Sequence, residues 1–96
     1  MVDSVSEALK SERVQQKMLT APDWKLSEDS IIRTFKLPSF RSALAFVQWV
    51  GEVAEAADHH PDIDIRYTKV KLTLSTHSAG GLTDKDFDLA AQIDQR

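Results

Sequence analysis

The sequence contains no cysteine, and it has only three glycines and three prolines among its 96 residues. Without cysteine the chain can form no disulfide, no thiolate nucleophile and no cysteine-ligated zinc site, and this absence suits a reducing compartment such as the cytoplasm. The few glycines and prolines leave no stretch typical of a long flexible linker. We therefore predict a single domain, residues 1–96, with one modest core.

Long runs of basic residues and of apolar residues are also missing. Twelve basic residues stand against fifteen acidic ones, for a net charge of −3, and such a balance gives little support to direct nucleic-acid binding. The first ten residues carry two acidic residues and two serines where a signal peptide needs an apolar run. The most apolar stretch, 43–50, includes Gln48 and is far shorter than the ~20 residues of a membrane span. We expect no membrane association and a cytoplasmic location.

A helix is predicted in the first 20 residues. Ser4 and Glu7 have the spacing of a capping box, which would open a helix over residues 6–19. The Ala-Pro-Asp sequence at 21–23 would end it. Its apolar stripe is thin, and the residues expected to be buried are Ala8, Leu9 and Met18.

Residues 24–37 are predicted to form a β-hairpin. A short strand at 24–26 and a longer strand at 31–37 flank the polar turn 27–30. Successive side chains of a strand point to opposite faces. One face of the longer strand should therefore carry Ile31, Arg33, Phe35 and Leu37, and the other Ile32, Thr34 and Lys36.

A long helix is predicted over residues 40–58, with Ser39 as its N-cap. The spacing of three and four residues gives a main apolar stripe of Phe40, Leu44, Val47, Val50 and Ala54, and a second stripe of Ala45, Phe46, Trp49, Val53 and Ala56. A helix that is apolar on two sides usually buries both. One side should meet the sheet and the other a second copy of the chain, so we expect a homodimer or homotetramer.

The rest of the chain predicts two strands and a last helix. Apolar and polar residues alternate over 63–67 and 70–74, with a short turn near 68–69. Thr83 and Asp86 have the spacing of a second capping box. The helix that they open should end near residue 94, with a buried side of Phe87, Ala90, Ala91 and Ile93. The order α-β-β-α-β-β-α predicts an α+β fold in which helices pack on one face of a four-stranded antiparallel sheet.

All three histidines fall between positions 59 and 77. Histidine titrates near neutrality, so a cluster of histidines can both donate and accept protons. Glu55 precedes His59 by four residues, and the two side chains can touch if the helix extends that far. His59 and His60 are consecutive and must point in different directions. They could grip a planar ligand from two sides, or one could be functional and the other structural.

Simpler interpretations exist for several of these residues. A histidine at a helix end is commonly a cap or a partner of the helix dipole. Helix capping alone explains Asp86, and from the residues we favour that interpretation. Glu55, His59 and His77 could instead form a two-histidine, one-carboxylate metal site. The usual spacings of zinc motifs are absent, so we expect no metal.

Seven residues in order resemble the signature of a known family. His59-His60-Pro61 follows Glu55 after three residues, Tyr67 stands six positions after the proline, His77 ten after the tyrosine, and Asp86 nine beyond. The set is similar to the pattern of the pterin-4a-carbinolamine dehydratases. The resemblance runs from about Trp24 to Ile93 and leaves the N-terminal helix, residues 1–20, outside it.

The resemblance implies an enzyme that dehydrates 4a-hydroxytetrahydropterin to quinonoid dihydropterin, which recycles the cofactor spent by aromatic amino acid hydroxylases. It implies no metal and no redox cofactor. His59 and His77 would be the acid–base pair, His60 would bind and orient the pterin, and Glu55 would tune His59. The pocket would be lined by Asp58 and by the segment Ser75, Thr76, His77 and Ser78.

A non-catalytic role is the alternative. Relatives in animals also act as dimerisation cofactors of a homeodomain transcription factor, and the apolar helix at 40–58 could serve such a role. Nothing in the sequence specifies a partner of that kind. The presence of all three histidines favours the enzyme, because a scaffold would need none of them.

Overall fold

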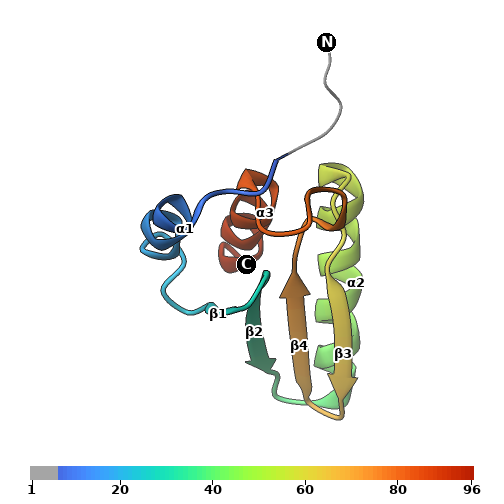
Figure 1. The fold of residues 1–96 in the computed structure, drawn as a ribbon. Helices are drawn as coiled ribbons and strands as arrows, with labels where there is room; N and C mark the ends of the chain where they lie inside the picture. The colour runs from blue at the N-terminus through green and yellow to red at the C-terminus, as the bar shows by residue number, and fades with distance from the viewer. Residues whose placement is uncertain (1–6) are drawn as a thin grey trace.

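The structure is a computed structural model that describes residues 7–96, and its elements follow the predicted order (Figure 1). The sheet has the strand order β1-β2-β4-β3, and each neighbouring pair is antiparallel. Figure 1 shows α2 and α3 against one face of the sheet, with α1 beside α3. The expected fold class is confirmed. The bounds are α1 Ser11–Met18, β1 Lys25–Ser27, β2 Ser30–Lys36, α2 Phe40–Ala57, β3 Asp62–Arg66, β4 Lys69–Leu74, the 3-10 helix η1 His77–Ala79 and α3 Asp84–Asp94.

The core forms where the apolar side of the sheet meets α2 and α3. Across the β2–β4 pair, Ile31 faces Leu74 and Phe35 faces Val70. On the other side of β4, Ile63 faces Leu72. Burial of the apolar residues of β4 follows the predicted alternation, because every second side chain points toward the helices. The opposite face of the sheet has no helix over it in Figure 1.

The N-cap of α2 is confirmed, whereas its predicted apolar stripe is partly wrong. The Ser39 hydroxyl accepts a hydrogen bond from the Ser42 backbone N–H at 3.0 Å. The side chains buried against the sheet are Ala43, Phe46, Val50 and Ala54. Phe40 and Leu44 remain 47% and 46% exposed. Two adjacent stripes are almost equally apolar, so helical periodicity alone does not decide which one faces the sheet.

The N-terminal helix is shorter than predicted. It begins at Ser11 rather than at residue 6, and the expected cap Ser4 lies outside the described residues. Ala8 is exposed and Leu9 is half-buried, whereas Val14 is the residue that α1 buries. The Leu9 backbone N–H donates to the Leu82 carbonyl oxygen at 2.7 Å. This long-range bond holds residue 9 in a non-helical segment against the loop before α3.

Two smaller predictions about buried or strand residues are wrong. Tyr67 was expected to continue β3, but it lies in the β3–β4 turn with φ of 55° and is 75% exposed. Its ring stacks on Phe40, with the centroids 6.5 Å apart. In α3 it is Leu89 that is buried, and the expected Ala91 is exposed. Within residues 7–96, no helix has both the length and the apolar character that a membrane crossing requires.

Candidate functional site

All three histidines lie at one end of the sheet. β3 begins at that end and β4 ends there, since Asp62 pairs with Thr73. β2 also begins there, because Ile31 pairs with Leu74. The segments 58–61 and 75–83 and the β1–β2 turn therefore meet beside the C-terminal end of α2 and the N-terminal end of α3 (Figure 1). We call this region the histidine end of the sheet.

The side chain of His59 contacts a buried carboxylate that belongs to α3. Its Nε2 lies 2.6 Å from Oδ1 of Asp86, in the first turn of α3. The side chain of His59 is only 11% exposed, and that of Asp86 is fully buried. Our interpretation of Asp86 as a helix cap alone was wrong, because the residue caps α3 and also binds an imidazole from the α2–β3 loop.

The second oxygen of Asp86 is also fully used. Oδ2 accepts from the Thr83 backbone N–H at 3.0 Å and from the Thr76 hydroxyl at 2.8 Å. The hydroxyls of Thr76 and Thr83 lie 2.8 Å apart. Within residues 7–96, no buried side-chain nitrogen or oxygen lacks a partner. The carboxylate is therefore fixed in place by backbone and side-chain donors, and it presents Oδ1 to His59.

These contacts assign the tautomer of His59. A carboxylate only accepts hydrogen bonds, so Nε2 of His59 must carry the proton that it donates to Asp86. In the neutral ring the lone pair then resides on Nδ1. Nδ1 of His59 is thus the ring nitrogen that does not contact Asp86.

Glu55 contacts His60, so the expected contact between Glu55 and His59 is wrong. Nε2 of His60 lies 2.5 Å from Oε2 of Glu55, and both side chains are largely exposed. The direction of the chain at the end of α2 explains this contact. Asp58, the C-cap of α2, adopts a left-handed conformation with φ of 52°, so His59 leaves the helical face that carries Glu55.

His77 lies on a different wall of the histidine end. It is exposed on η1 and lines a hollow of about 400 Å³. The other lining residues come from the β1–β2 turn and from the chain around β4, and neither His59 nor His60 is among them. The chain still connects the two walls closely, because Thr76 binds the same carboxylate as His59. The remaining lining residues are Ser27, Glu28, Asp29, Ser30, Ile32, Ser75 and Gly80.

The other predicted site residues differ in what they can offer a ligand. Ser75 lines the hollow with His77, and Ser78 is exposed on η1. Thr76 is buried and its hydroxyl is engaged by Asp86. Asp58 is exposed beside His59. Tyr67 of the signature lies at the opposite end of the sheet, because it connects the end of β3 to the start of β4.

A three-ligand metal site of Glu55, His59 and His77 has no geometric basis in the part of the chain that the structure describes. Among residues 7–96, no group of three or more histidine, cysteine, aspartate or glutamate side chains is arranged to hold a metal ion. Glu55 and His59 instead contact different partners.

Sequence reasoning missed the acidic pair Glu28 and Asp29 in the β1–β2 turn, which shares the hollow with His77. It also missed the second function of Asp86. The capping-box spacing of Thr83 and Asp86 was visible, but the partner His59 is 27 residues away in the chain. Only the packing of α3 beside the C-terminal end of α2 brings the two together.

Comparisons with known proteins agree with the signature. Residues 7–96 match the family model described as pterin 4 alpha carbinolamine dehydratase. This match includes α1, whereas the sequence resemblance began near Trp24. A Chloroflexus aurantiacus protein, named "Putative pterin-4-alpha-carbinolamine dehydratase", is 56% identical over 91 residues, which cover 95% of this chain and 94% of that relative.

Two solved structures share the fold. One is described as a transcriptional coactivator/pterin dehydratase from Brucella melitensis, with a TM-score of 0.87 and 28% identity over 93% of this chain and 97% of that one. The other is a pterin dehydratase-like protein identified as a RuBisCO assembly factor in the alpha-carboxysome. It has a TM-score of 0.61 and 22% identity over 75% of this chain and 83% of that one, and it supports the fold alone. Together with the match over residues 7–96, these findings show that the chain belongs to the pterin 4 alpha carbinolamine dehydratase family.

Proposed function

We propose that the protein dehydrates 4a-hydroxytetrahydropterin to quinonoid dihydropterin by general acid–base catalysis with histidines. The family match and the 56% identical relative support the reaction class. The single observation that carries the catalytic assignment is the pairing of His59 with the buried carboxylate of Asp86 at 2.6 Å.

The reaction requires two proton transfers and no change of oxidation state. A proton is delivered to the 4a-hydroxyl oxygen, the C4a–O bond breaks and water leaves. A proton is removed from ring nitrogen N5, and its electron pair forms the C4a=N5 double bond. One group must give a proton and another must take one, which is the task of positioned imidazoles.

The surroundings of the histidines suggest how these tasks are divided. His59 presents Nδ1 as its basic nitrogen, and the carboxylate of Asp86 would stabilise the imidazolium once the N5 proton has moved to His59. His77 is open to solvent on the wall of the hollow and would deliver a proton to the leaving hydroxyl. His60, with Glu55, would orient the heterocycle. Asp86 thus takes the supporting role that the sequence had given to Glu55.

The test is turnover of 4a-hydroxytetrahydropterin by the purified protein and by two variants. We expect His59→Ala and His77→Ala each to lower kcat by about 10²-fold or more, the usual scale for a positioned proton-transfer group. Steady-state kinetics measures the effect, and circular dichroism checks that each variant is folded. Wild-type rates in both variants would rule out the assignment.

A binding role is the second candidate function, and exposed apolar side chains on α2 and β3 favour it. Phe40 and Leu44 of α2 are nearly half exposed, and Ile63 and Ile65 of the edge strand β3 are 38% and 37% exposed. Exposed apolar side chains of this kind are common in protein interfaces, and we propose that these residues join copies of the chain into a homodimer or homotetramer. The Brucella relative is described as both coactivator and dehydratase. If the purified protein lacks dehydratase activity, a pull-down with a tagged chain tests the binding role, which predicts that a partner is captured.

We place this reaction in the cytoplasm. The absence of cysteine from the chain supports that compartment, because disulfides are rare where thiols are kept reduced.

A further inference from the structure

A row of basic side chains crosses the face of the sheet that no helix covers (Figure 1). Lys69 of β4 lies opposite Lys36 of β2 on one side and opposite Arg66 of β3 on the other. The buried residues of β4 point toward the helices, so Lys69 and its two cross-strand partners point to the open face. All three residues are exposed. We call Lys36, Lys69 and Arg66 the basic row.

The basic row lies at the end of the sheet opposite the histidines, and its position is fixed. Lys36 ends β2, and Arg66 and Lys69 flank the β3–β4 turn. The Leu37 backbone N–H donates to the Thr68 carbonyl oxygen of that turn at 2.8 Å. This bond holds the end of β2 against the turn, so the three basic residues stay in register on neighbouring strands.

The positive charges of the basic row are only partly neutralised within the protein. Nε of Arg66 lies 3.3 Å from Oδ1 of Asp64. Neither Lys36 nor Lys69 takes part in any ion pair of residues 7–96. Like charges directly opposite each other on neighbouring strands are destabilising, and Lys69 has one on each side. An anionic partner bound to the row would relieve this repulsion.

Protection of a sheet edge does not account for the lysines of β4. Lysine on an edge strand blocks pairing with another chain, but β4 lies between β2 and β3. Lys69 and Lys71 are therefore on a central strand. Together with Arg66 they line a hollow of about 290 Å³, with Thr34 and Asp64 as the other lining residues. The hollow offers an anionic group one guanidinium, two ammonium groups and a hydroxyl.

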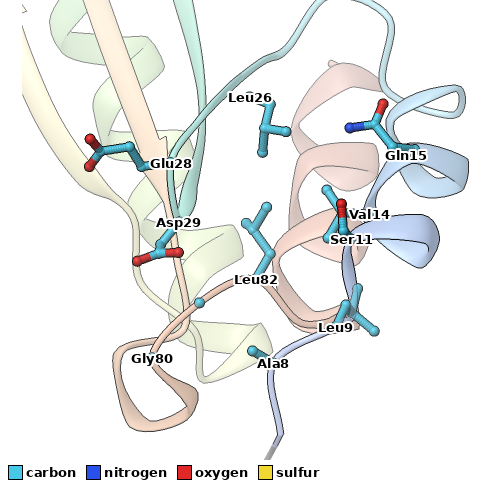
Figure 2. Close-up of a pocket in the computed structure, with 11 residues that line it drawn as sticks. Ala8, Leu9, Ser11, Val14, Gln15, Leu26, Glu28, Asp29, Gly80 and Leu82 are labelled. Carbon is cyan, nitrogen blue, oxygen red and sulfur yellow. The ribbon is translucent and has the colours of Figure 1, made fainter.

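The two ends of the sheet differ in charge. At the histidine end, Figure 2 shows the carboxylates of Glu28 and Asp29 beside a hollow whose apolar lining includes Leu26 and Leu82. The same two acidic residues line the hollow with His77. Among the described residues, neither of these two linings includes a lysine or an arginine. A negatively charged partner is therefore repelled from these hollows and attracted to the basic row.

We propose that the basic row and Lys71 form a docking surface for an acidic segment of a partner protein. Neighbouring strands are about 4.8 Å apart, so the row spans roughly 10 Å. In an extended peptide, side chains that point the same way are about 7 Å apart. Two or three aspartates or glutamates at alternate positions of such a segment would bring their carboxylates within reach of the row.

Two features favour an acidic protein segment over a nucleic acid. Asp62 and Asp64 of β3 lie on the same face, where they would repel a continuous chain of phosphates. The side chains that β2, β3 and β4 direct to this face include no aromatic ring on which bases could stack. A short segment with separate carboxylates can contact the row and avoid both aspartates.

The test uses two peptides that differ only in charge. One is acetyl-Glu-Ser-Glu-Ser-Glu-amide, and the other has glutamine in place of each glutamate. Each is titrated into the ¹⁵N-labelled full chain, and amide chemical shifts locate the contact and give its Kd. A four-nucleotide thymidine oligomer, which also carries three negative charges, is the nucleic-acid probe. Titrations at low and at physiological salt measure the electrostatic part of binding.

We expect the glutamate peptide to shift the amides of the basic row and of the β3–β4 turn. It should bind about tenfold or more tightly than the glutamine peptide, the scale of three exposed ion pairs, and physiological salt should weaken its binding. Lys69→Glu should abolish the contact. The matched control is Lys85→Glu, which makes the same charge change at an exposed lysine of α3 and should leave the Kd unchanged.

Lys69→Glu also tests the repulsion within the row in the absence of any ligand. A carboxylate at this position would face a cation on each neighbouring strand, so the melting temperature should rise above that of the wild type. A lower melting temperature in the folded variant would remove the repulsion on which the proposal rests.

The peptide titrations decide the proposal without any variant. Absent or equal binding of the two peptides, or shifts that lie elsewhere on the molecule, would overturn it. Unchanged peptide binding in a folded Lys69→Glu would do the same. Tighter binding of the thymidine oligomer than of the glutamate peptide at the basic row would overturn the choice of partner. None of these results bears on the proposed reaction, because the row lies outside the histidine end.

Discussion

Two histidine–carboxylate pairs with almost the same N–O distance involve the adjacent residues His59 and His60, but the pairs differ in how exposed they are to solvent. His59 and Asp86 approach to 2.6 Å, and His60 and Glu55 approach to 2.5 Å. The side chains of the first pair are 11% and 0% exposed, and those of the second are 56% and 75% exposed. Exposed pairs contribute only about 0–1 kcal/mol to stability, because water screens and competes with them. The N–O distance alone therefore does not show which pair contributes more to stability.

The pairs differ further in how the carboxylate is held. The two oxygens of Asp86 accept hydrogen bonds from Thr76, Thr83 and His59. Glu55 has only His60 as a partner within the described residues. A carboxylate that is held by donors on both of its oxygens can hold a ring at one angle and in one tautomer. This difference supports the proposal that the buried pair transfers a proton and that the exposed pair contacts the ligand.

Replacing the buried carboxylate should have the largest effect. Asp86→Asn leaves one acceptor oxygen where three donors converge, so the amide group must face either His59 or the Thr76 and Thr83 donors. We expect kcat to fall by about 10²-fold and the free energy of unfolding to fall by about 1–3 kcal/mol. Steady-state kinetics and urea unfolding measure the two effects.

The position of the proton on the His59 ring tests the role assigned to Asp86. In the wild type, ¹⁵N chemical shifts should show the proton of neutral His59 on Nε2, as the contact with Asp86 requires. A proton on Nδ1 in the folded wild type would contradict the tautomer assignment. Wild-type kcat in a folded Asp86→Asn would show that the buried pair is not a catalytic arrangement.

Removing the exposed imidazole should have an intermediate effect. In His60→Ala we expect a KM several-fold above that of the wild type and little change in kcat, because His60 would contact the pterin without transferring a proton. Kinetics over a range of substrate concentrations separates the two constants. A fall in kcat as large as that of His59→Ala, at unchanged KM, would reverse the roles assigned to the two pairs.

The smallest effect should come from the exposed carboxylate. Glu55→Gln keeps an acceptor oxygen near His60, and both side chains are well solvated. We expect kcat and KM to remain within about twofold of the wild type, and stability to remain within about 0.5 kcal/mol. It is the matched control for Asp86→Asn, since each variant replaces a carboxylate by its amide. Equal losses in the two amide variants would remove the distinction between the pairs.

Much of the fold could be read from local signals. Ser39 and the Thr83–Asp86 capping box marked the starts of α2 and α3 correctly, because caps depend on residues within one turn. The alternation in β4 identified its buried face for the same reason. The start of α1 was wrong because a bond from residue 9 to Leu82 decides it, and no local pattern reports that contact.

The candidate site divides in the same way. The order of its histidines and acidic residues along the chain was enough to identify the family, and the match over residues 7–96 agrees. The sequence did not show which carboxylate contacts which histidine. Spacing of four residues favoured Glu55 with His59, but the left-handed Asp58 turns the chain so that Glu55 contacts His60 instead.

The sequence by itself determined the order of the elements, the helix caps, the buried face of β4 and the set of residues that marks the family, because each depends on neighbours in the chain. Only the tertiary structure decided which carboxylate holds which imidazole, which stripe of α2 faces the sheet and that the β1–β2 turn shares a hollow with His77. These are contacts between segments far apart in sequence. They are fixed by the packing of the helices on the sheet and by the need to pair every buried polar group.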